Sequence, residues 1–492
     1  MYRRCIRRNA CRVSGVVPCG VGSMSVGNFE NACIVRSAWL EKGGRRLDCN
    51  PYMSGALEAY ETVNALKAKI ENLHEVTSAI FDSGRESRKW VDAKKYGIGY
   101  MGTSAINVAD LSYLPLISRK QVRDNPRLPI KRGWSLITRS GTVGRMAYVR
   151  PDMEGLTCSE DVLRVVPDDA KILSGYLYAY LASKYGVPLV VAGTYGAIIQ
   201  HIEPEHIRDL PVPRFDASFE SAVNSKIEKA AQLLSDYQSW IQQATDTFFS
   251  SVGLKDLELG EWNDSGADTG FSVRSPDVAS LRALNFNPRF SALVKKIKSG
   301  PYKKLNDICL PGTLARGGRF RRVDAHPDHA YQMVGQKELF WIKPEGRWVA
   351  KSAMDENSLG IPGAVMIAAQ GTLGESELYC RAEFIWGPWT ELAFSEHILR
   401  VISDESIMPR GCLFAFMRSE TAFRMLRSIS VGSKLQDHHY KYRGELPVPY
   451  PEVNVQHEIH EKVVSAYEAR HKATAMTDEA IEMVEQRIAK GE

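Results

Sequence analysis

Two long stretches of the chain carry apolar residues at the period of a coiled coil. In the first stretch, steps of four and three residues alternate between the apolar positions, which are Val223, Ile227, Ala230, Leu234, Tyr237, Ile241, Ala244 and Phe248. A similar seam follows 236 positions later at Ile459, Val463, Ala466, Ala473, Ala480 and Val484, interrupted by Arg470 and Thr477. This spacing predicts two long helices. Each helix could simply pack on its own globular unit, but the matched seams favour pairing with each other.

Ahead of each helix, short apolar runs alternate with glycine turns. The expected strands of the first set are residues 134–137, 146–149 and 162–166, and those of the second set are 364–367, 378–379 and 398–402. A helix is expected to begin near Ile172 and near Pro409. Each set then reaches Pro-Val-Pro, at 211–213 and 447–449, where proline predicts a turn that ends the unit.

The two sets are copies of one another. Laid without gaps at an offset of 236, residues 159–213 and 395–449 share 16 identities in 55 positions. Ser159-Glu160 returns as Ser395-Glu396, and Leu210-Pro211-Val212-Pro213 returns as 446–449. A repeat of this length can build its own core, so it predicts a duplicated domain and not a solenoid.

The order of these elements predicts an α+β fold with two tandem similar domains. Each domain is a mixed β-sheet with helices and is followed by one long helix, and the two helices pair as an antiparallel coiled coil. The expected segments are a basic tail (1–25), domain 1 (26–215), spacer helix 1 (216–253), an exposed acidic linker (254–272), domain 2 (273–450) and spacer helix 2 (451–492).

Composition adds little to this picture. The chain has 492 residues, 44% of them hydrophobic, and a net charge of +5, which permits basic patches without requiring them. Nine cysteines without a metal-ligand spacing favour buried thiols in a reducing compartment, the cytoplasm. No apolar run approaches the length of a membrane span, so no membrane partner is expected. The arginine-rich first residues could be a transit peptide, a basic tail, or the product of an upstream start codon, with Met24 as the natural start.

The ordered motifs resemble a known family. They are Gly-x-x-Leu-Ile-x-Arg-Ser-Gly-Thr-Val-Gly-Arg at 133–145, Ser-Glu-Asp at 159–161, Gly196 with Gln200, and Leu-Pro-Val-Pro before a long helix. Together, and occurring in both halves, they resemble the specificity (S) subunits of type I restriction–modification systems. The resemblance implies two target-recognition domains that each read one half of a split DNA sequence. In the second copy Arg139-Ser140 becomes Ala369-Gln370 and Arg145 becomes Glu375, so the two loops are not expected to make identical contacts.

The resemblance also implies partners. It implies that the chain binds double-stranded DNA without being an enzyme, and that it directs DNA methyltransferase subunits to the target, with or without a restriction translocase–nuclease subunit. No cofactor or metal is expected on this chain; S-adenosylmethionine, ATP and magnesium are expected on the partner subunits. Two alternatives stay open: a methylation-only or other phage-defence complex without a nuclease, and a protein scaffold that reads no DNA.

The residues themselves show no catalytic constellation. The chain lacks the Asn/Asp-Pro-Pro-aromatic loop of amino-methyltransferases, its nearest match being Asn50-Pro51-Tyr52, and it lacks the phosphate-binding G-x-x-x-x-G-K-[ST] motif. Catalytic residues and metal ligands are therefore not assigned.

Candidate DNA contacts follow from what DNA offers to a protein. Phosphates need cations, base edges need paired donors and acceptors, and glycine turns let the backbone approach closely. Each candidate loop could instead be a hairpin turn that points away from any ligand. The candidates are Arg139, Ser140, Gly141, Thr142, Gly144, Arg145, Tyr195, Gly196, Gln200 and His201 in the first half, and Arg319, Arg321, Gln370, Gly371, Thr372, Gly374, Ser433, Lys434 and Gln436 in the second.

Overall fold

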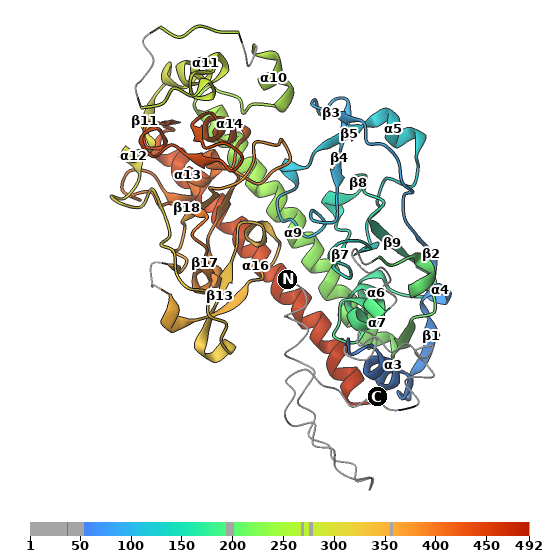
Figure 1. Cartoon of the computed structure of the whole chain (residues 1–492). Coiled ribbons are helices and arrows are strands. Elements are labelled where there is room, and N and C mark those ends of the chain that lie inside the picture. The colour runs from blue at the N-terminus through green and yellow to red at the C-terminus, as the bar shows by residue number, and fades with distance from the viewer. Residues whose placement is uncertain are drawn as a thin grey trace.

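The two helices predicted from the apolar seams run through the centre of the molecule. The computed structural model describes residue 37 and residues 54–491, with gaps at 193–200, 267–269, 275–278 and 355–357. Helices α9 (Ala217–Ser251) and α16 (Val453–Ala489) lie side by side, with a globular unit on either side of the pair (Figure 1). We call residues 54–216 the first unit and residues 279–452 the second unit. The basic tail 1–25 lies outside the described residues.

The first unit contains two four-stranded sheets and a two-stranded ribbon. The main sheet has the order β2-β9-β6-β7 and is antiparallel, whereas the second sheet, β3-β5-β4-β8, includes the parallel pair β4–β8. All four residues of the central strand β6 are buried, as their apolar run predicts. The elements are α3 (Ala56–Asn64), β1 (Lys69–Asn72), α4 (Leu73–Val76), β2 (Thr77–Phe81), β3 (Trp90–Val91), β4 (Gly97–Met101), β5 (Leu116–Ser118), α5 (Arg119–Asp124), β6 (Ser135–Thr138), β7 (Met146–Tyr148), β8 (Thr157–Cys158), β9 (Val162–Pro167), α6 (Ser174–Leu181), α7 (Gly186–Ala192), α8 (Pro204–Ile207) and β10 (Pro211–Arg214).

The second unit repeats this plan. Its main sheet has the order β12-β18-β15-β16, and a three-stranded sheet, β14-β13-β17, includes the parallel pair β13–β17. The elements are α11 (Pro288–Lys298), β11 (Tyr302–Lys304), α12 (Leu305–Ile308), β12 (Ala315–Arg316), β13 (Ala330–Val334), β14 (Arg347–Ala350), β15 (Val365–Ala368), β16 (Ala382–Phe384), β17 (Ala393–Phe394), β18 (Ile398–Val401), α13 (Arg410–Met417), α14 (Glu420–Ser428), β19 (Ser430–Val431), β20 (Asp437–His438), α15 (Tyr440–Arg443) and β21 (Pro447–Pro449).

The duplication seen in the sequence is therefore confirmed as a duplication of topology. Strand β9 corresponds to β18, helix α6 to α13 and helix α9 to α16, each at an offset of 236. The parallel pair β4–β8 corresponds to β13–β17. The predicted α+β class, with two tandem mixed-sheet units that are each followed by a long helix, is correct.

Three local predictions were wrong. Pro-Val-Pro is not a turn: residues 211–214 and 447–449 are strands, paired antiparallel with β1 and β11 in two-stranded ribbons, where a strand can tolerate the missing N–H of proline. Leu378-Tyr379 is not a strand, since the second strand after the glycine turn is β16, at 382–384. The acidic linker is not simply exposed. It forms helix α10 (Leu259–Asp264), Trp262 is buried, and the Asp256 carboxylate accepts hydrogen bonds from the backbone N–H groups of Glu420 and Thr421 at the start of α14.

Helices α9 and α16 are antiparallel. Lys226 pairs with Glu479 at 2.7 Å and Arg487 pairs with Asp216 at 3.1 Å, so the start of one helix meets the end of the other. The apolar seam positions of both helices are buried. The helices also pack on the globular units. At the C-terminal end of α16, Ala480, Val484 and Ile488 join the hydrophobic core of the first unit. Pairing with each other and packing on the units are thus both correct.

Arg470, which interrupts the second seam, is completely buried in the helix pair. Its guanidinium pairs with Glu383 at 3.1 Å and donates hydrogen bonds to the Tyr237 hydroxyl at 3.1 Å and to the backbone oxygen of Trp341 at 2.5 Å. Because a buried charge is tolerated only when it is paired and hydrogen-bonded, these partners explain how a cation occupies a coiled-coil core position.

Stability should fall in mild acid because of a buried histidine. Burial, together with Arg443 and Arg316, lowers the pKa of His438 to about 3. Its contribution is fully present above the unfolded pKa near 6.5 and is lost as the pH falls toward 3, because only the unfolded chain then takes up the proton. Between pH 7.5 and 5.0 we expect the free energy of unfolding to drop by about 2 kcal/mol from this group alone. Urea titrations at both pH values measure the drop.

The matched variants are His438→Gln and, at an exposed position, His329→Gln. The first should reduce the pH dependence by that amount. The second removes an exposed histidine and controls for the substitution itself. His471, whose pKa burial and Arg470 lower to about 4, keeps part of the dependence in both variants. If the free energy of unfolding of His438→Gln fell with pH as much as that of the wild type, His438 would not be the source of the pH dependence.

Candidate nucleic-acid interface

The two glycine loops proposed for DNA contact connect adjacent strands of the main sheets. In the first unit, residues 139–145 join β6 to β7, and in the second unit, residues 369–381 join β15 to β16. Each loop meets the other predicted loop of its unit through an isolated backbone bridge, Ser140 with His201 and Gly371 with Gln436. The structure therefore brings the predicted loops together in both units. Tyr195, Gly196 and Gln200 lie outside the described residues.

Arg139, the first residue of the loop in the first unit, is held by partners of its own unit. Its guanidinium pairs with Glu203 and with Asp82, the latter at 3.5 Å, and donates to the backbone oxygens of Ile202 and Glu160, each at 3.2 Å. The neighbouring Ser140 hydroxyl donates to Asp161 at 2.7 Å. These partners tie the loop to the segments that follow β2 and that precede β9 and α8. Arg139 therefore has ion-pair partners within its own unit, and contact of the loop with DNA stays a prediction.

Arg145 also has a partner, and that partner belongs to the other unit. Its guanidinium carbon lies 3.8 Å from the centre of the Trp341 ring, a cation–π contact. The strand positions change the counterpart of Arg145 in the second unit. Arg145 immediately precedes β7, and the residue that immediately precedes the equivalent strand β16 is Arg381, not Glu375. Arg381 likewise lies over a ring of the opposite unit, 4.2 Å from the centre of Tyr113.

The longer loop of the second unit is held against helix α14. Arg424 pairs with Glu375 at 2.6 Å, and Arg427 donates to the backbone oxygens of Leu373 at 2.7 Å and Gly374 at 2.8 Å. The backbone of Gln370 exchanges hydrogen bonds with the side chain of Gln336, at 2.9 and 3.0 Å. Thr372 is half-buried and Gly374 is exposed. Glu375 is therefore a loop anchor that the first unit lacks.

The second predicted loop of the second unit, residues 433–436, contains both exposed and buried residues. Ser433 and Lys434 are exposed, but Gln436 is buried, with only 3% of its surface accessible, and its side-chain amide donates to the backbone oxygen of Ser433. Gln436 thus shapes the turn in this structure and is not displayed for a base edge. In the first unit Gln200, the counterpart of Gln436, lies outside the described residues, and the neighbouring His201 is half-buried.

Exposed cations gather in a pair of segments that correspond in the two units. Arg319 and Arg321, both predicted, are exposed and follow β12. The matching segment of the first unit follows β2 and is not among the residues predicted from the sequence. Its exposed cations are Arg85, Arg88, Lys89, Lys94 and Lys95. The signal was present in the sequence, because Val91-Asp92-Ala93 returns as Val323-Asp324-Ala325. We call residues 85–95 and 316–322 the two basic segments.

The repeated Ser-Glu motif orients the basic segments. Arg88 pairs with Glu160 at 3.1 Å in the first unit, and Arg322 pairs with Glu396 at 2.9 Å in the second. These pairs are partly exposed and contribute little to stability. Their role is to position the basic segments, because equivalent glutamates in the two units hold equivalent basic segments against the main sheets. The repeated Arg164, by contrast, is completely buried and donates to the backbone oxygens of Ser159 and Val162, so it ties segments of the fold together.

We also searched the described residues for metal sites, free thiols and membrane-spanning helices. No group of three or more His, Cys, Asp or Glu side chains in it could hold a metal ion. Cys158, Cys309, Cys380 and Cys412 are buried free thiols, as predicted. None of the described helices is long and apolar enough to cross a bilayer.

Comparison with solved structures finds specificity subunits of type I restriction–modification systems among its matches. The S subunit of a type I restriction–modification system from M. genitalium is 12% identical, and the match covers 87% of this chain and 96% of that one, with a TM-score of 0.36. The HsdS subunit from Thermoanaerobacter tengcongensis is 11% identical over 86% and 96% of the two chains, with a TM-score of 0.26. The chain is similar to type I specificity subunits.

A third match comes from a study of complex assembly and conformational transition of the type I R-M system. It is 11% identical, covers 84% of this chain and 97% of that one, and has a TM-score of 0.25. No family model matches the chain, and no curated protein matches it. Because these TM-scores are low, the roles of individual residues are taken from this chain's own geometry.

Proposed function

We propose that the chain is a non-catalytic subunit that reads a bipartite DNA sequence. The observation that carries the proposal is the pair of matched basic segments, one on each copy of a duplicated unit, each held by the same glutamate. Exposed Lys and Arg side chains provide phosphate contacts, which position a protein on DNA, while nearby loops of unequal sequence provide the means to read different bases. Two similar units on one chain suit a target with two parts.

The helix pair supports the bipartite form of the target. Helix α9 has 35 residues, which at 1.5 Å per residue is about 52 Å, of the order of one to two turns of B-DNA. Two units held by such a pair would reach half-sites separated by a gap that neither unit reads.

The partners belong to the same proposal. DNA methyltransferase subunits that carry S-adenosylmethionine, and an ATP- and magnesium-dependent restriction translocase–nuclease subunit in restricting complexes, would supply the chemistry, in the cytoplasm. A methylation-only or other phage-defence complex would use the same chain without the nuclease. The matched exposed basic segments favour DNA reading over the alternative of a protein scaffold.

The test measures binding of fluorescent duplex DNA to the full chain together with its methyltransferase partner. Between 50 and 200 mM salt, affinity should fall linearly on a log–log plot, with a slope of about −0.9 for each phosphate neutralised. A scaffold would show no salt-sensitive binding. Methyl transfer by the purified chain without a partner would contradict the non-catalytic role.

A further inference from the structure

The two units touch each other directly at a short antiparallel backbone contact. The loop after β4 and the loop after β13 form a bridge between Val108 and Trp341. The backbone N–H of Ala109 donates to the oxygen of Phe340 at 3.0 Å, and the N–H of Ile342 donates to the oxygen of Asn107 at 2.8 Å. We call residues 107–113, 340–342 and Arg418 the inter-unit junction.

This contact lies on an approximate two-fold axis of the chain. Strands β4 and β13 begin at 97 and 330, an offset of 233. At the same offset Asn107 corresponds to Phe340 and Ala109 corresponds to Ile342. The donor and acceptor of one backbone hydrogen bond are therefore the counterparts of the donor and acceptor of the other. The duplicated chain thus forms within itself the kind of self-complementary contact that a symmetric dimer forms between two subunits.

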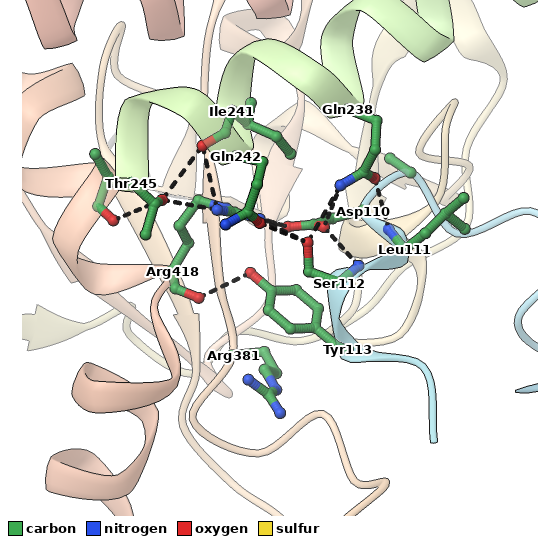
Figure 2. Close-up of polar contacts among 12 residues, drawn as sticks. Asp110, Leu111, Ser112, Tyr113, Gln238, Ile241, Gln242, Thr245, Arg381 and Arg418 are labelled. Atoms are coloured by element: carbon green, nitrogen blue, oxygen red, sulfur yellow. Dashed lines mark hydrogen bonds and ion pairs between the residues drawn. The ribbon is translucent and has the colours of Figure 1, made fainter. Parts of the chain in front are cut away.

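A buried ion pair fastens one side of this contact (Figure 2). Asp110 of the first unit pairs with Arg418 of the second at 2.7 Å, and 2% of the arginine side chain and 9% of the aspartate side chain are exposed. Arg418 also donates to Thr245 of α9 at 2.7 Å. Burial raises the pKa of Asp110, but Arg418 and hydrogen bonds from Ser112 outweigh burial and lower this pKa to about 2. The carboxylate is therefore charged at neutral pH and joins both units to the spacer helix.

The ion pair between Asp110 and Arg418 has no counterpart at the equivalent positions on the other side of the two-fold axis. At an offset of 233 the counterpart of Asp110 is Lys343, which forms an exposed pair with Asp478 at 2.6 Å. The residue that follows α6, equivalent to Arg418 after α13, is Ala182. The buried charges thus occur on one side only. A buried ion pair is not needed for stability, since apolar residues can replace one without loss, but it admits one geometry.

The junction also reaches the glycine loops. Arg145 and Arg381, the last residues of the two loops, lie over Trp341 and Tyr113, rings of the opposite unit. The Tyr113 hydroxyl donates to the backbone oxygen of Arg418 at 3.1 Å. Arg381 also lies 3.4 Å from the centre of the Phe423 ring of its own unit. The last residue of each loop thus contacts the other unit at the junction.

We propose that the inter-unit junction holds the two units at one separation, so that Asp110 and Arg418 are positioning residues that fix the number of base pairs allowed between the half-sites. The first part of this inference concerns the chain alone, and the second part rests on the proposed function. The two parts are tested by separate measurements.

The first measurement is the distance distribution between spin labels at Tyr60 and Tyr302. Both positions are exposed, one on each unit, and genetically encoded labels avoid the native cysteines. The wild-type distribution should be narrow, and Asp110→Asn and Arg418→Met should each broaden it. The matched control is Glu220→Gln, which disrupts the ion pair at 2.9 Å between the first turn of α9 and Arg214 of the first unit, away from the junction. Distributions as narrow as the wild type in both junction variants, with circular dichroism showing a folded chain, would overturn the inference.

The second measurement uses the chain with its methyltransferase partner and duplexes whose half-site gap is changed by one or two base pairs. Wild type should prefer one gap by about tenfold or more, and the junction variants should reduce this preference to about threefold or less. General destabilisation would weaken binding to all gaps equally. Unchanged discrimination despite broadened distances would refute the role in spacing. If even the wild type binds no DNA, the proposed function fails, while the label distances still decide whether the junction fixes the units.

Discussion

Replacing Arg470 with methionine should lower the free energy of unfolding by about 3–5 kcal/mol, because the change leaves Glu383 as an unpaired buried charge. Only 3% of Glu383 is exposed, and its remaining side-chain partner is the Tyr467 hydroxyl. The backbone oxygens of Trp341 and Ile342 would also lose the donors that Arg470 provides. Urea unfolding followed by circular dichroism measures the loss.

The matched control is Arg487→Met on the same helix. Arg487 pairs with Asp216 at 3.1 Å, but a third of the arginine side chain and half of the aspartate side chain are exposed. Such a pair contributes at most about 1 kcal/mol. The double variant Arg470→Met, Glu383→Leu should recover part of the loss, because it removes both buried charges together. If Arg470→Met were no more destabilising than Arg487→Met, the role of Arg470 as a charge required in the helix pair would be wrong.

Removing four exposed cations from the basic segments should weaken DNA binding by a factor on the order of 10³ at 0.1 M salt if all four contact phosphates. The variant is Arg85→Ala, Lys89→Ala, Arg319→Ala and Arg321→Ala. The slope of log affinity against log salt should become shallower by about 4, one unit for each lost contact. Fluorescence anisotropy with duplex DNA and the chain in complex with its methyltransferase partner measures both quantities.

A second quadruple variant separates local contact from net charge. Lys255→Ala, Lys295→Ala, Lys296→Ala and Lys298→Ala remove the same charge from exposed positions outside the basic segments. This control should keep the wild-type slope and most of the affinity. Equal losses in the two variants would mean that net charge attracts DNA and that residues 85–95 and 316–322 are not its binding surface.

The architecture could be predicted from the sequence because it depends on local periodicity and on the internal repeat. The seam from Val223 to Phe248 is buried along its whole length. The offset of 236 identifies equivalent strands and helices wherever the connecting loops are equally long. Arg470 marked a departure from the seam, but its partners come from three separate segments, so no local pattern could identify them.

The candidate site was harder to predict because its residues depend on tertiary contacts. Matching the glycine turns at an offset of 230 gave Glu375 as the counterpart of Arg145, whereas the longer loop of the second unit places Arg381 there. Arg139 and Arg145 are cations beside a glycine turn, a pattern typical of phosphate contact, yet their partners are carboxylates and a ring brought in by the fold. The basic segment at 85–95 lies outside the clearest block of the repeat and was missed for that reason.

The central claim is that this chain directs modification to a two-part DNA sequence. Sequencing that detects methylated bases, applied to cells with and without the chain, tests it most directly. The account predicts a methylated motif made of two short parts, separated by a gap of fixed length, that is present only when the chain is present. A methylation pattern that is identical in both kinds of cell, or a chain-dependent motif without a gap, would contradict it.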